Sequence, residues 1–369
     1  MKFSCEKSLL QAAISTAARA VSPKSSIPAL EGILVEALGE LRLTGYNLET
    51  GIRTTVPAEI GRQGSLVLSA RLFGEIVRKL PDDVVTLSAE NYMVNIRCGL
   101  SEFNIMGTAP EDFPELPSVE SQQSFSLVRR DFSSMLRQTL FAVSDNESRP
   151  IHTGALLEVG DDGLTVVAVD GFRLALRREP VLEKDSPSLS VVVPGAALSE
   201  VEKICGDSEE PVTVYHGTRH VMFRAGDTIL VSRRLEGEFL AWRQAVPRSN
   251  TIQVTGETQS LLSSIERVSL IISDKLKSPL RCRFEDGMLY LSTKTAIGDA
   301  ADQCPLQGDG TGLEIGFNNR YLIDALKAAP AQKVRLELST PVSPCVILPT
   351  EQEEKFLYMV LPVRLKAGE

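Results

Sequence analysis

Three stretches of the chain repeat one pattern: FSCEKSLLQAAISTAARAVS at residues 3–22, FSLVRRDFSSMLRQTLFAVS at 125–144, and VTGETQSLLSSIERVSLIIS at 254–273. They align without gaps at offsets of 122 and 129 residues. The apolar residues that recur in all three copies have a spacing of four and then seven residues, which falls on one stripe of an α-helix. These matching positions are Leu10/Phe132/Leu261, Ile14/Leu136/Ile265 and Val21/Val143/Ile272. Each copy is therefore predicted to open with a short strand and to continue as an amphipathic helix.

A second helix is predicted later in each copy, after a strand-like apolar run. Ser69, Pro194 and Asn318 are spaced by 125 and 124 residues, and each stands where an N-cap or first-turn residue belongs. Helices and strands joined by short connections predict antiparallel sheets that are covered by helices on one face. Strands are predicted between and after the helices where apolar residues alternate, as at 41–44, 164–168 and 288–292.

The repeats predict the fold class and the domain organisation. The chain has 369 residues, more than the roughly 250–300 at which a single hydrophobic core stops growing. We expect an α+β protein with three tandem copies of one domain, antiparallel sheets outside and two helices per domain inside. Polar segments rich in Pro and Ser mark boundaries near 121/122 and 249/250, which gives domains 1–121, 122–249 and 250–369.

Charge is divided unevenly between the helices and the rest of the chain. The predicted helices contain 12 Lys and Arg against 7 Asp and Glu, although the whole chain has a net charge of −9. Simple solvation of exposed helix faces is one explanation. The other explanation is that the three domains bend into an arc with all helices on the inner side, and that two such arcs pair into a ring. The inner surface would then be positive and would attract phosphates without reading bases. The ranges counted are 7–21, 69–79, 129–143, 194–204, 257–272 and 318–328.

Signals for catalysis, metal binding or membrane insertion are weak. The six cysteines are scattered without a CxxC pair, which predicts reduced packing thiols rather than disulfides or a zinc site. His216 and His220 have a metal-pair spacing, but Gly217 and the strand-like run before it predict a turn. No GxSxG motif or phosphate-binding loop is present. We expect no catalytic residue, metal or cofactor and, without a long apolar run or signal segment, a cytoplasmic location.

Several motifs resemble the DNA polymerase III beta subunit family, the bacterial sliding clamps, over the whole length of the chain. The markers are Met1-Lys2-Phe3, the segment Ile-Pro-Ala-Leu at 27–30, Asp112-Phe113-Pro114, the segment 169–175, Gly316-Phe317-Asn318 with Tyr321, and the terminal segment 359–365. The resemblance implies a ring of two subunits in head-to-tail pairing that encircles duplex DNA without sequence specificity. It further implies a non-catalytic processivity factor for DNA replication. Its expected partners are a clamp loader, the replicative polymerase alpha subunit and other proteins that carry a clamp-binding motif, and we expect no association with a membrane.

Partners of this family carry a short peptide, typically with Gln, Leu and a terminal Leu or Phe. The resemblance implies that this peptide docks in a pocket between the second and third domains. Leu240 and Gln244 depart from the proline and arginine of a known relative, so we expect a different peptide preference. The matching positions are Gly171, Phe172, Arg173, Leu174, Leu240, Gln244, Ala245, Val246, Asn318, Tyr321, Met359, Leu361, Pro362, Val363 and Arg364.

The resemblance also implies residues for DNA contact and for dimer formation. DNA contact is expected of Lys24, Arg71, Asn146 and Arg149. To these we add Arg129 and Arg130, because cations at the start of a helix oppose its dipole and call for another explanation, either phosphate attraction or solvation. The dimer is expected to pair Phe103 and Ile105 of one chain with Ile271 and Ile272 of another. We expect the last two to follow one another in a helix, so that both cannot face one core.

Two other functions fit parts of the sequence. A scaffold of repeats that binds only proteins would have the same three domains. A metal-dependent nuclease would use Asp145, Glu147 and Asp170 as metal-binding carboxylates. Retention on closed circular DNA and divalent-dependent cleavage of DNA separate these alternatives from a clamp.

Overall fold

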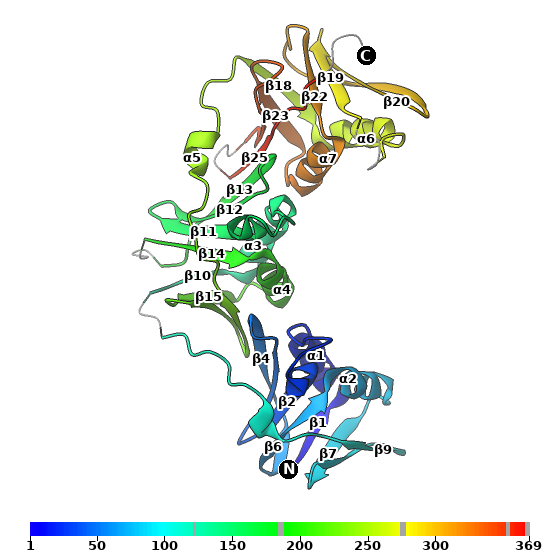
Figure 1. Cartoon of the computed structure of the whole chain (residues 1–369), viewed down its shortest axis with the longest axis vertical. Helices are drawn as coiled ribbons and strands as arrows, with labels where there is room; N and C mark the ends of the chain where they lie inside the picture. Colours follow the sequence, from blue (N-terminus) through cyan, green and yellow to red (C-terminus); the bar gives the residue numbers. More distant parts are fainter. Residues whose placement is uncertain (121–122, 184–187, 274–277, 352–354, 366–369) are drawn as a thin grey trace. The chain divides into compact units, whose positions relative to one another are not determined.

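The computed structural model describes residues 1–120, 123–183, 188–273, 278–351 and 355–365 (Figure 1). Its contacts divide the chain into two compact units. The first unit consists of Met1–Ser133, Leu182–Pro187 and Glu200–Arg234. The second unit is made of the rest, which is Ser134–Val181, Ser188–Ser199 and Leu235–Glu369. Each unit contains two antiparallel sheets with helices, so the predicted α+β class is confirmed.

The first unit contains a five-stranded and an eight-stranded sheet. The five-stranded sheet has the order β5 (Glu59–Arg62), β1 (Lys2–Glu6), β7 (Val84–Glu90), β8 (Met93–Cys98) and β9 (Ser101–Met106). The eight-stranded sheet has the order β10 (Ser124–Val128), β15 (Pro211–His216), β16 (His220–Ala225), β17 (Thr228–Arg233), β4 (Thr50–Val56), β3 (Leu41–Tyr46), β2 (Gly32–Ala37) and β6 (Gly64–Ser69).

The eight-stranded sheet continues across the predicted boundary at 121/122. Strand β17, which follows that boundary, pairs with β4, which precedes it. Thr228 stands opposite Thr54 there, and their hydroxyls lie 2.9 Å apart. Two repeats of the sequence therefore share one ladder of backbone hydrogen bonds.

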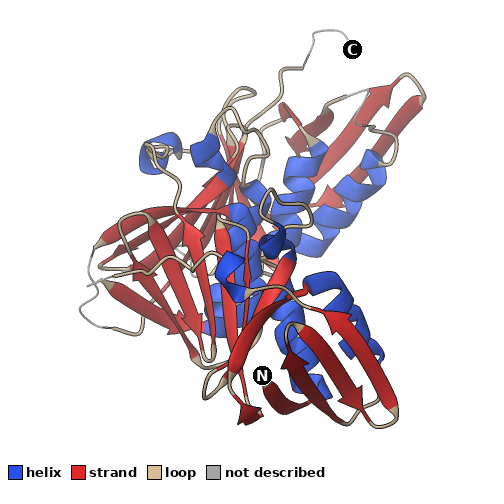
Figure 2. Ribbon diagram, turned by 60° about the horizontal axis from the view of Figure 1, so that its bottom comes forward, coloured by secondary structure: helices blue, strands red, loops and turns tan. Residues whose placement is uncertain are grey.

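Helices α1 (Lys7–Ala18) and α2 (Ala70–Lys79) pack side by side in the first unit, where they cover the sheets (Figures 1 and 2). Leu10 and Ile14 of α1 are buried, as the 3.6-residue period requires. Ser69 caps α2, because its hydroxyl accepts a hydrogen bond from the Leu72 amide. The predicted N-cap position in the first repeat is therefore confirmed.

The second unit also has two sheets, and one of them crosses the predicted boundary at 249/250. At this crossing Leu174 of β13 stands opposite Met359 of β25. The eight-stranded sheet has the order β14 (Leu189–Pro194), β11 (Gly154–Gly160), β12 (Gly163–Val169), β13 (Arg173–Glu179), β25 (Phe356–Val360), β24 (Cys345–Pro349), β23 (Lys333–Leu338) and β18 (Ile252–Glu257). The four-stranded sheet has the order β21 (Gly298–Pro305), β20 (Met288–Thr295), β19 (Leu280–Glu285) and β22 (Leu313–Phe317).

The remaining helices complete the repeats. Helices α6 and α7 lie side by side in the second unit (Figure 1). Asn318 caps α7 through a hydrogen bond from the Arg320 amide to its side-chain oxygen, 3.1 Å long. The bounds are α3 (Arg129–Arg137), α4 (Gly195–Cys205), α5 (Trp242–Ala245), α6 (Thr258–Ser269) and α7 (Asn319–Ala328), with 3-10 helices η1 (Pro28–Glu31), η2 (Pro110–Asp112), η3 (Leu140–Ala142) and η4 (Pro150–Thr153).

The first helix of each repeat is shorter than predicted, in the same way each time. These helices end at Ala18, Arg137 and Ser269 rather than at 21, 143 and 272. The third matching position lies beyond the helix in all three copies. There the backbone closes with tight i to i+3 hydrogen bonds, from Val21 to Ala18, from Val143 to Leu140, and from Ile272 to Ser269.

Candidate binding groove

A groove of about 790 Å³ lies in the second unit, between the turn after β12, the start of α7 and the chain after β25. Aromatic and aliphatic side chains form much of its wall, with a few amides and hydroxyls. This composition is typical of pockets that bind short peptides or small molecules. The lining residues are Phe172, Ile272, Ser273, Ser278, Pro279, Phe317, Asn318, Asn319, Arg320, Tyr321, Leu361, Pro362 and Val363.

The turn between β12 and β13 holds Phe172 out toward the groove. The Asp170 carboxylate accepts hydrogen bonds from the amides of Phe172, at 2.9 Å, and of Arg173, at 3.1 Å. Gly171 has φ +93°, a conformation that glycine adopts without strain. The Phe172 side chain is 60% exposed, and its ring stacks on Tyr321 with 6.3 Å between ring centroids. Local turn chemistry therefore positions one aromatic wall of the groove.

Arg173 connects this turn to α7 behind the aromatic wall. Its guanidinium bonds to Asp170 at 2.8 Å and to Asp324 at 2.5 Å, and its side chain is only 12% exposed. It also lies over the rings of Tyr321, at 4.6 Å, and Phe141, at 5.5 Å. Burial raises the pKa of Tyr321, with Asp170 adding to the effect, so the phenol is neutral at neutral pH.

The chain after β25 closes the other side of the groove. Leu361 donates its amide proton to the Phe172 carbonyl at 2.8 Å, and Val363 donates to the Gly316 carbonyl at 2.8 Å. A Cβ on Gly316 would lie 2.6 Å from the Val363 carbonyl oxygen, so glycine permits this close approach. Arg364 follows as an exposed residue.

The residues predicted for a peptide pocket fall into separate groups. Phe172, Asn318, Tyr321, Leu361, Pro362 and Val363 line the groove. Leu174, Met359, Ala245 and Val246 pack instead in an apolar cluster with Trp242, and the first two are almost fully buried. Gly171 and Arg173 shape the turn as described. Leu240, Gln244 and Arg364 are exposed, and none of these three is among the residues that line the groove.

Sequence reasoning missed several lining residues and one residue beneath the predicted site. Ile272 was expected in a dimer contact, and its expected helical position is wrong because α6 ends at Ser269. Trp242, the one tryptophan of the chain, lies in the apolar cluster with the guanidinium of Arg243 4.2 Å from its ring. Its position in the sequence between the predicted pocket residues Leu240 and Gln244 could have identified Trp242 as part of this cluster. The other missed lining residues are Ser273, Ser278, Pro279, Phe317, Asn319 and Arg320.

The residues expected to contact DNA are distributed over both units. Lys24 and Arg71 are exposed in the first unit, although Arg71 lies 3.4 Å from Glu75. Asn146 and Arg149 are exposed on the loop before η4 in the second unit. The Asn146 side chain accepts the Ser148 amide proton at 3.0 Å, which fixes that loop locally.

The two arginines at the start of α3 differ from one another. Arg129 is 12% exposed, bonds to Glu210 at 3.0 Å and donates to the Pro211 carbonyl at 3.3 Å. Arg130 is 52% exposed and bonds to Glu209 at 2.9 Å. Arg129 therefore has a structural explanation, whereas Arg130 remains accessible to solvent.

Many basic side chains of the helices form ion pairs, which the charge count along the sequence did not reveal. Several of the partner carboxylates come from strands and loops outside the helices. The positive charge of the helices is therefore partly neutralised where it stands. The pairs are Lys7–Asp82, Arg71–Glu75, Arg129–Glu210, Arg130–Glu209, Lys203–Glu200, Arg267–Asp302 and Lys327–Glu266.

The residues expected at a dimer contact lie on an edge strand and after a helix. Phe103 and Ile105 belong to β9, at one edge of the five-stranded sheet, and Phe103 is 38% exposed. Ile271 and Ile272 are half-buried in the turn after α6. An edge strand with exposed apolar side chains is a surface on which another chain can pair.

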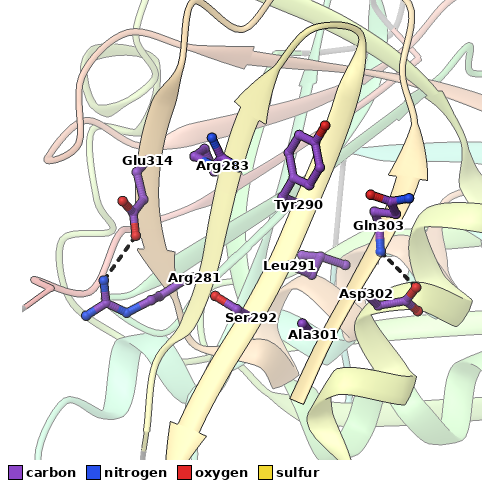
Figure 3. A pocket seen from close by; sticks show the side chains of 9 residues that line it. All are labelled: Arg281, Arg283, Tyr290, Leu291, Ser292, Ala301, Asp302, Gln303 and Glu314. Carbon is purple, nitrogen blue, oxygen red and sulfur yellow. Dashed lines mark hydrogen bonds and ion pairs between the residues drawn. The ribbon is translucent and has the colours of Figure 1, made fainter. Parts of the chain in front are cut away.

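A second hollow, of about 540 Å³, lies on a face of the four-stranded sheet (Figure 3). Arg281 bonds to Glu314 at 3.0 Å there, and the guanidinium of Arg283 lies 4.6 Å from the Tyr290 ring. Asp302 bonds outward to Arg267 at 2.6 Å. The charged groups of this hollow are thus engaged with their neighbours rather than converging on one point.

The described parts of the chain contain neither a metal-binding cluster nor a membrane-spanning helix. Within residues 1–120, 123–183, 188–273, 278–351 and 355–365, no cluster of three or more His, Cys, Asp or Glu side chains could hold a metal ion. Among these same residues, no helix is long and apolar enough to cross a membrane. All six cysteines are buried, as expected of packing thiols.

Known proteins match this chain along its whole length. Three family models, for the N-terminal, central and C-terminal domains of the DNA polymerase III beta subunit, match residues 1–117, 126–240 and 243–364. A beta sliding clamp of Halalkalibacterium halodurans is 32% identical over 99% of this chain and 100% of its own length.

Solved structures match equally well. The DNA polymerase sliding clamp from Bacillus subtilis has a TM-score of 0.94 at 30% identity, covering 99% of this chain and 100% of that one. A putative DNA polymerase III beta subunit from Eubacterium rectale has a TM-score of 0.92 at 34% identity, covering 98% and 99%. The chain belongs to the DNA polymerase III beta subunit family, the bacterial sliding clamps.

Proposed function

We propose that this protein is a sliding clamp, a non-catalytic processivity factor that encircles duplex DNA and tethers the replicative polymerase and other replication and repair proteins. The observation that carries the proposal is the tandem match of all three domains of the family, over nearly the whole chain. The groove beside Phe172 and Tyr321 supports it, because tethering requires a surface for partner peptides. The proposed location is the cytoplasm.

We propose that two chains pair head-to-tail into a ring, with the first domain of each against the third domain of the other. Phe103 and Ile105 of β9 would form one side, and Ile271 with Ile272 the other. The exposed edge of β9 supports this arrangement, because its unpaired backbone groups are available to a second chain. The proposed domains are 1–121, 122–249 and 250–369, and the three spans matched by the family models fall within or close to them.

DNA is proposed to be held by its phosphates rather than by base contacts, since a clamp must move along any sequence. Lys24, Arg71, Asn146, Arg149 and Arg130 are the candidates. Their exposure supports this role. Arg129 is the weakest candidate, because Glu210 and Pro211 already engage its guanidinium.

Partner proteins are proposed to dock a short peptide with Gln, Leu and a terminal Leu or Phe. The groove would receive the end of the peptide against Phe172, Tyr321, Pro362 and Val363. Leu174, Val246 and Met359 would form the floor of an adjoining apolar site, next to Leu240, Gln244, Ala245 and Arg364. Proposed partners are the clamp loader, the polymerase alpha subunit and other proteins with this motif.

Retention on DNA of different topology tests the proposal. The purified protein, loaded by a clamp loader, is expected to stay on circular plasmid at salt that strips electrostatic binders, and to slide off linearised plasmid. Equal loss from both forms would contradict a ring and leave a scaffold that binds only proteins. Cleavage of the plasmid that depends on a divalent ion would favour the nuclease with Asp145, Glu147 and Asp170.

A further inference from the structure

The eight-stranded sheet of the first unit has an outward face that carries several arginines. Strands β15, β16 and β17 are neighbours in this sheet, and their side chains alternate between its two faces. Val214, Phe223 and Leu230 stand on one face and are almost fully buried, so that face points to the core. Residues opposite one another in neighbouring strands share a face. The outward residues are therefore Tyr215 of β15, His220, Met222 and Arg224 of β16, and Ile229 and Arg233 of β17.

Three arginines of this surface form no ion pair with the described part of the chain. Arg224 and Arg233 are exposed, and Arg219 is exposed in the turn that precedes His220. Among the residues that the structure describes, none of the three has an Asp or Glu oxygen within 4.0 Å. We call Arg219, Arg224 and Arg233, together with His220 and Tyr215, the arginine face.

The surroundings of His220 are those of an uncompensated positive charge. Burial lowers the pKa of His220, and the nearby Arg233 and Arg219 lower it further. Glu120 lines the same hollow of about 410 Å³ as Arg219 and His220, but its carboxylate forms no ion pair with these two described residues. Residues 121 and 122 lie outside the described residues, and as Ser and Gln they carry no charge.

Two further acidic residues border the arginine face. Asp227 is exposed in the turn between β16 and β17, and Glu49 is exposed in the turn before β4, where its carbonyl accepts the Arg233 amide proton at 2.9 Å. Arg53 of β4 stands opposite Ile229 and adds a half-buried guanidinium to the outward face. Four guanidinium groups thus outnumber three carboxylates in this region, although the whole chain has a net charge of −9.

The arrangement of the charges fits a phosphate backbone. Arg224 and His220 are four residues apart on one strand, and Arg233 stands opposite His220, so the two arginines are separated by about 13 Å. Guanidinium groups at that spacing can contact separate phosphates of one chain, and each can donate two hydrogen bonds to phosphate oxygens. Such contacts read no base, so the sequence of the nucleic acid would not matter.

An aromatic ring among these charges favours a single strand over a duplex. The guanidinium of Arg224 lies 5.7 Å from the Tyr215 ring. Tyrosine rings and guanidinium planes stack on unpaired bases in proteins that bind single strands. The bases of a duplex are stacked on one another and offer no free ring face. An acidic peptide would satisfy the arginines but would leave the Tyr215 ring without a stacking partner.

We propose that the arginine face binds single-stranded nucleic acid, with its three guanidinium groups on separate phosphates and an unpaired base against Tyr215. None of the residues proposed above to hold duplex DNA belongs to the arginine face. The face is therefore a second surface for nucleic acid, and its binding does not require a closed ring.

Arg42 provides a matched control on the same side of the same sheet. It is two residues from Thr44, which stands opposite Arg53, so Arg42 shares the outward face with Arg53. Arg42 is exposed as well, but Glu40 forms an ion pair with it. Arg42→Gln therefore removes an exposed arginine whose charge is already neutralised.

The test uses a fluorescein-labelled strand of about 20 thymidines and a duplex of the same length, without a clamp loader. Affinities are measured by fluorescence polarisation for the native protein, for Arg42→Gln, and for a triple variant with Arg219→Gln, Arg224→Gln and Arg233→Gln. The native protein and Arg42→Gln are expected to prefer the single strand over the duplex by about 3-fold or more.

The triple variant is expected to bind the single strand about 10-fold or more weakly than the native protein. Each lost phosphate contact lowers the slope of log affinity against log salt by about 0.7 for single strands, so the slope should become shallower by about 2. An unchanged affinity and slope in the triple variant would overturn the proposal.

Cross-linking locates the site without any variant. A strand that contains bromouracil, irradiated on the native protein, is expected to label Tyr215 or its neighbours on β15 and β16, as mapped by mass spectrometry. Labelling confined to the helices would overturn the proposal even if the triple variant bound weakly.

Three other results would also contradict it. An equal loss in Arg42→Gln and the triple variant would show a general charge effect. Equal affinity for strand and duplex would show that no unpaired base is recognised. Displacement of the labelled strand by polyglutamate as readily as by an unlabelled strand of equal charge would identify an acidic protein segment as the ligand.

The ring and the arginine face can fail separately. A native protein that stays on circular plasmid but binds no single strand would contradict the arginine face alone. A native protein that binds the single strand through the arginine face but leaves circular and linear plasmid equally fast would contradict the ring alone.

Discussion

The guanidinium carbon of Arg173 lies 4.6 Å from the centroid of the Tyr321 ring. The same side chain bonds to Asp170 in the turn before it and to Asp324 one helical turn after Tyr321. The β12–β13 turn and α7 are thereby joined through one half-buried cation. The Phe172–Tyr321 wall of the groove consequently depends on a residue that does not itself line the groove.

Replacing Arg173 by Ala is expected to weaken peptide binding by about tenfold or more, because it leaves the Tyr321 ring and two carboxylates without their shared partner. Fluorescence polarisation with a labelled motif peptide measures the loss. The matched control is Arg283→Ala, since Arg283 also lies 4.6 Å from a tyrosine ring, that of Tyr290, but on the four-stranded sheet. A similar loss of peptide affinity in Arg173→Ala and Arg283→Ala would contradict this account, because only Arg173 lies beside the groove.

Gly45 of β3 permits the close approach of α1 to the sheet. A Cβ at this position would lie 2.0 Å from the carbonyl oxygen of Ala17. We expect Gly45→Ala to lower the free energy of unfolding of the first unit by about 2–3 kcal/mol, because backbone rather than a flexible side chain must move. Gly160→Ala is the control, since a Cβ there meets nothing within 4 Å. Denaturant midpoints that fall equally in both variants would contradict this account.

The six cysteines are expected to resist thiol reagents in the folded protein. All are buried, and burial raises the pKa of Cys205 and of Cys345 to about 12. The reactive thiolate is therefore scarce as well as inaccessible. A chromogenic disulfide reagent at about pH 8 should label almost none before denaturation and all six afterwards. Rapid labelling of one cysteine in the native protein would reveal an accessible thiol.

The sequence predicted the repeating helices because their signal is local. Apolar residues four apart, such as Leu10 and Ile14, must lie on one helix face, and both are buried. The helix ends were less predictable. Val21, Val143 and Ile272 continue the apolar spacing, yet each lies beyond the end of its helix, where the backbone forms a tight turn.

The groove could be predicted only in part, because its walls come from segments far apart along the chain. Phe172, Tyr321 and Pro362 were identified through the family resemblance. Pairings such as β13 with β25 and β17 with β4 are not encoded in any local period, so the continuous sheets across both domain boundaries were not expected. No local sequence pattern indicated that Arg320 and Pro279 line the groove.

Acidification is expected to destabilise the folded protein through its histidines. Burial lowers the pKa of His152, His216 and His220, and nearby arginines lower them further. The unfolded chain then binds more protons than the folded one, so stability is lost as the pH falls below about 6.5.

Two measurements check this expectation. Denaturant midpoints should fall between about pH 7.5 and about pH 5.5, and NMR titration of the imidazoles should give midpoints below about 6.5. The pKa of Asp302 is held below its usual value by the hydrogen bond from Arg267, so this carboxylate stays charged over that range. Imidazole midpoints above about 6.5 would reverse the predicted sign.

Phe103→Asp is expected to yield monomers, because it would introduce a buried charge where the edge strand β9 is proposed to pair with a second chain. Phe103 is 38% exposed within its own chain, so the folded monomer should tolerate the change. Ile105→Asp is less suitable, because Ile105 packs partly against the core of the first unit. Leu38→Asp is the control, since Leu38 is 56% exposed outside that strand.

Sedimentation equilibrium should give the chain mass of 40.2 kDa for Phe103→Asp and about twice that mass for the native protein and Leu38→Asp. The same monomer should still bind the motif peptide, because the groove lies in the second unit and Phe103 in the first. It should also lose its retention on circular plasmid, because an open chain cannot enclose DNA. If Phe103→Asp remains a dimer, the dimer contact does not involve Phe103 of β9. If the variant is a monomer that still stays on circular DNA, retention does not require a ring.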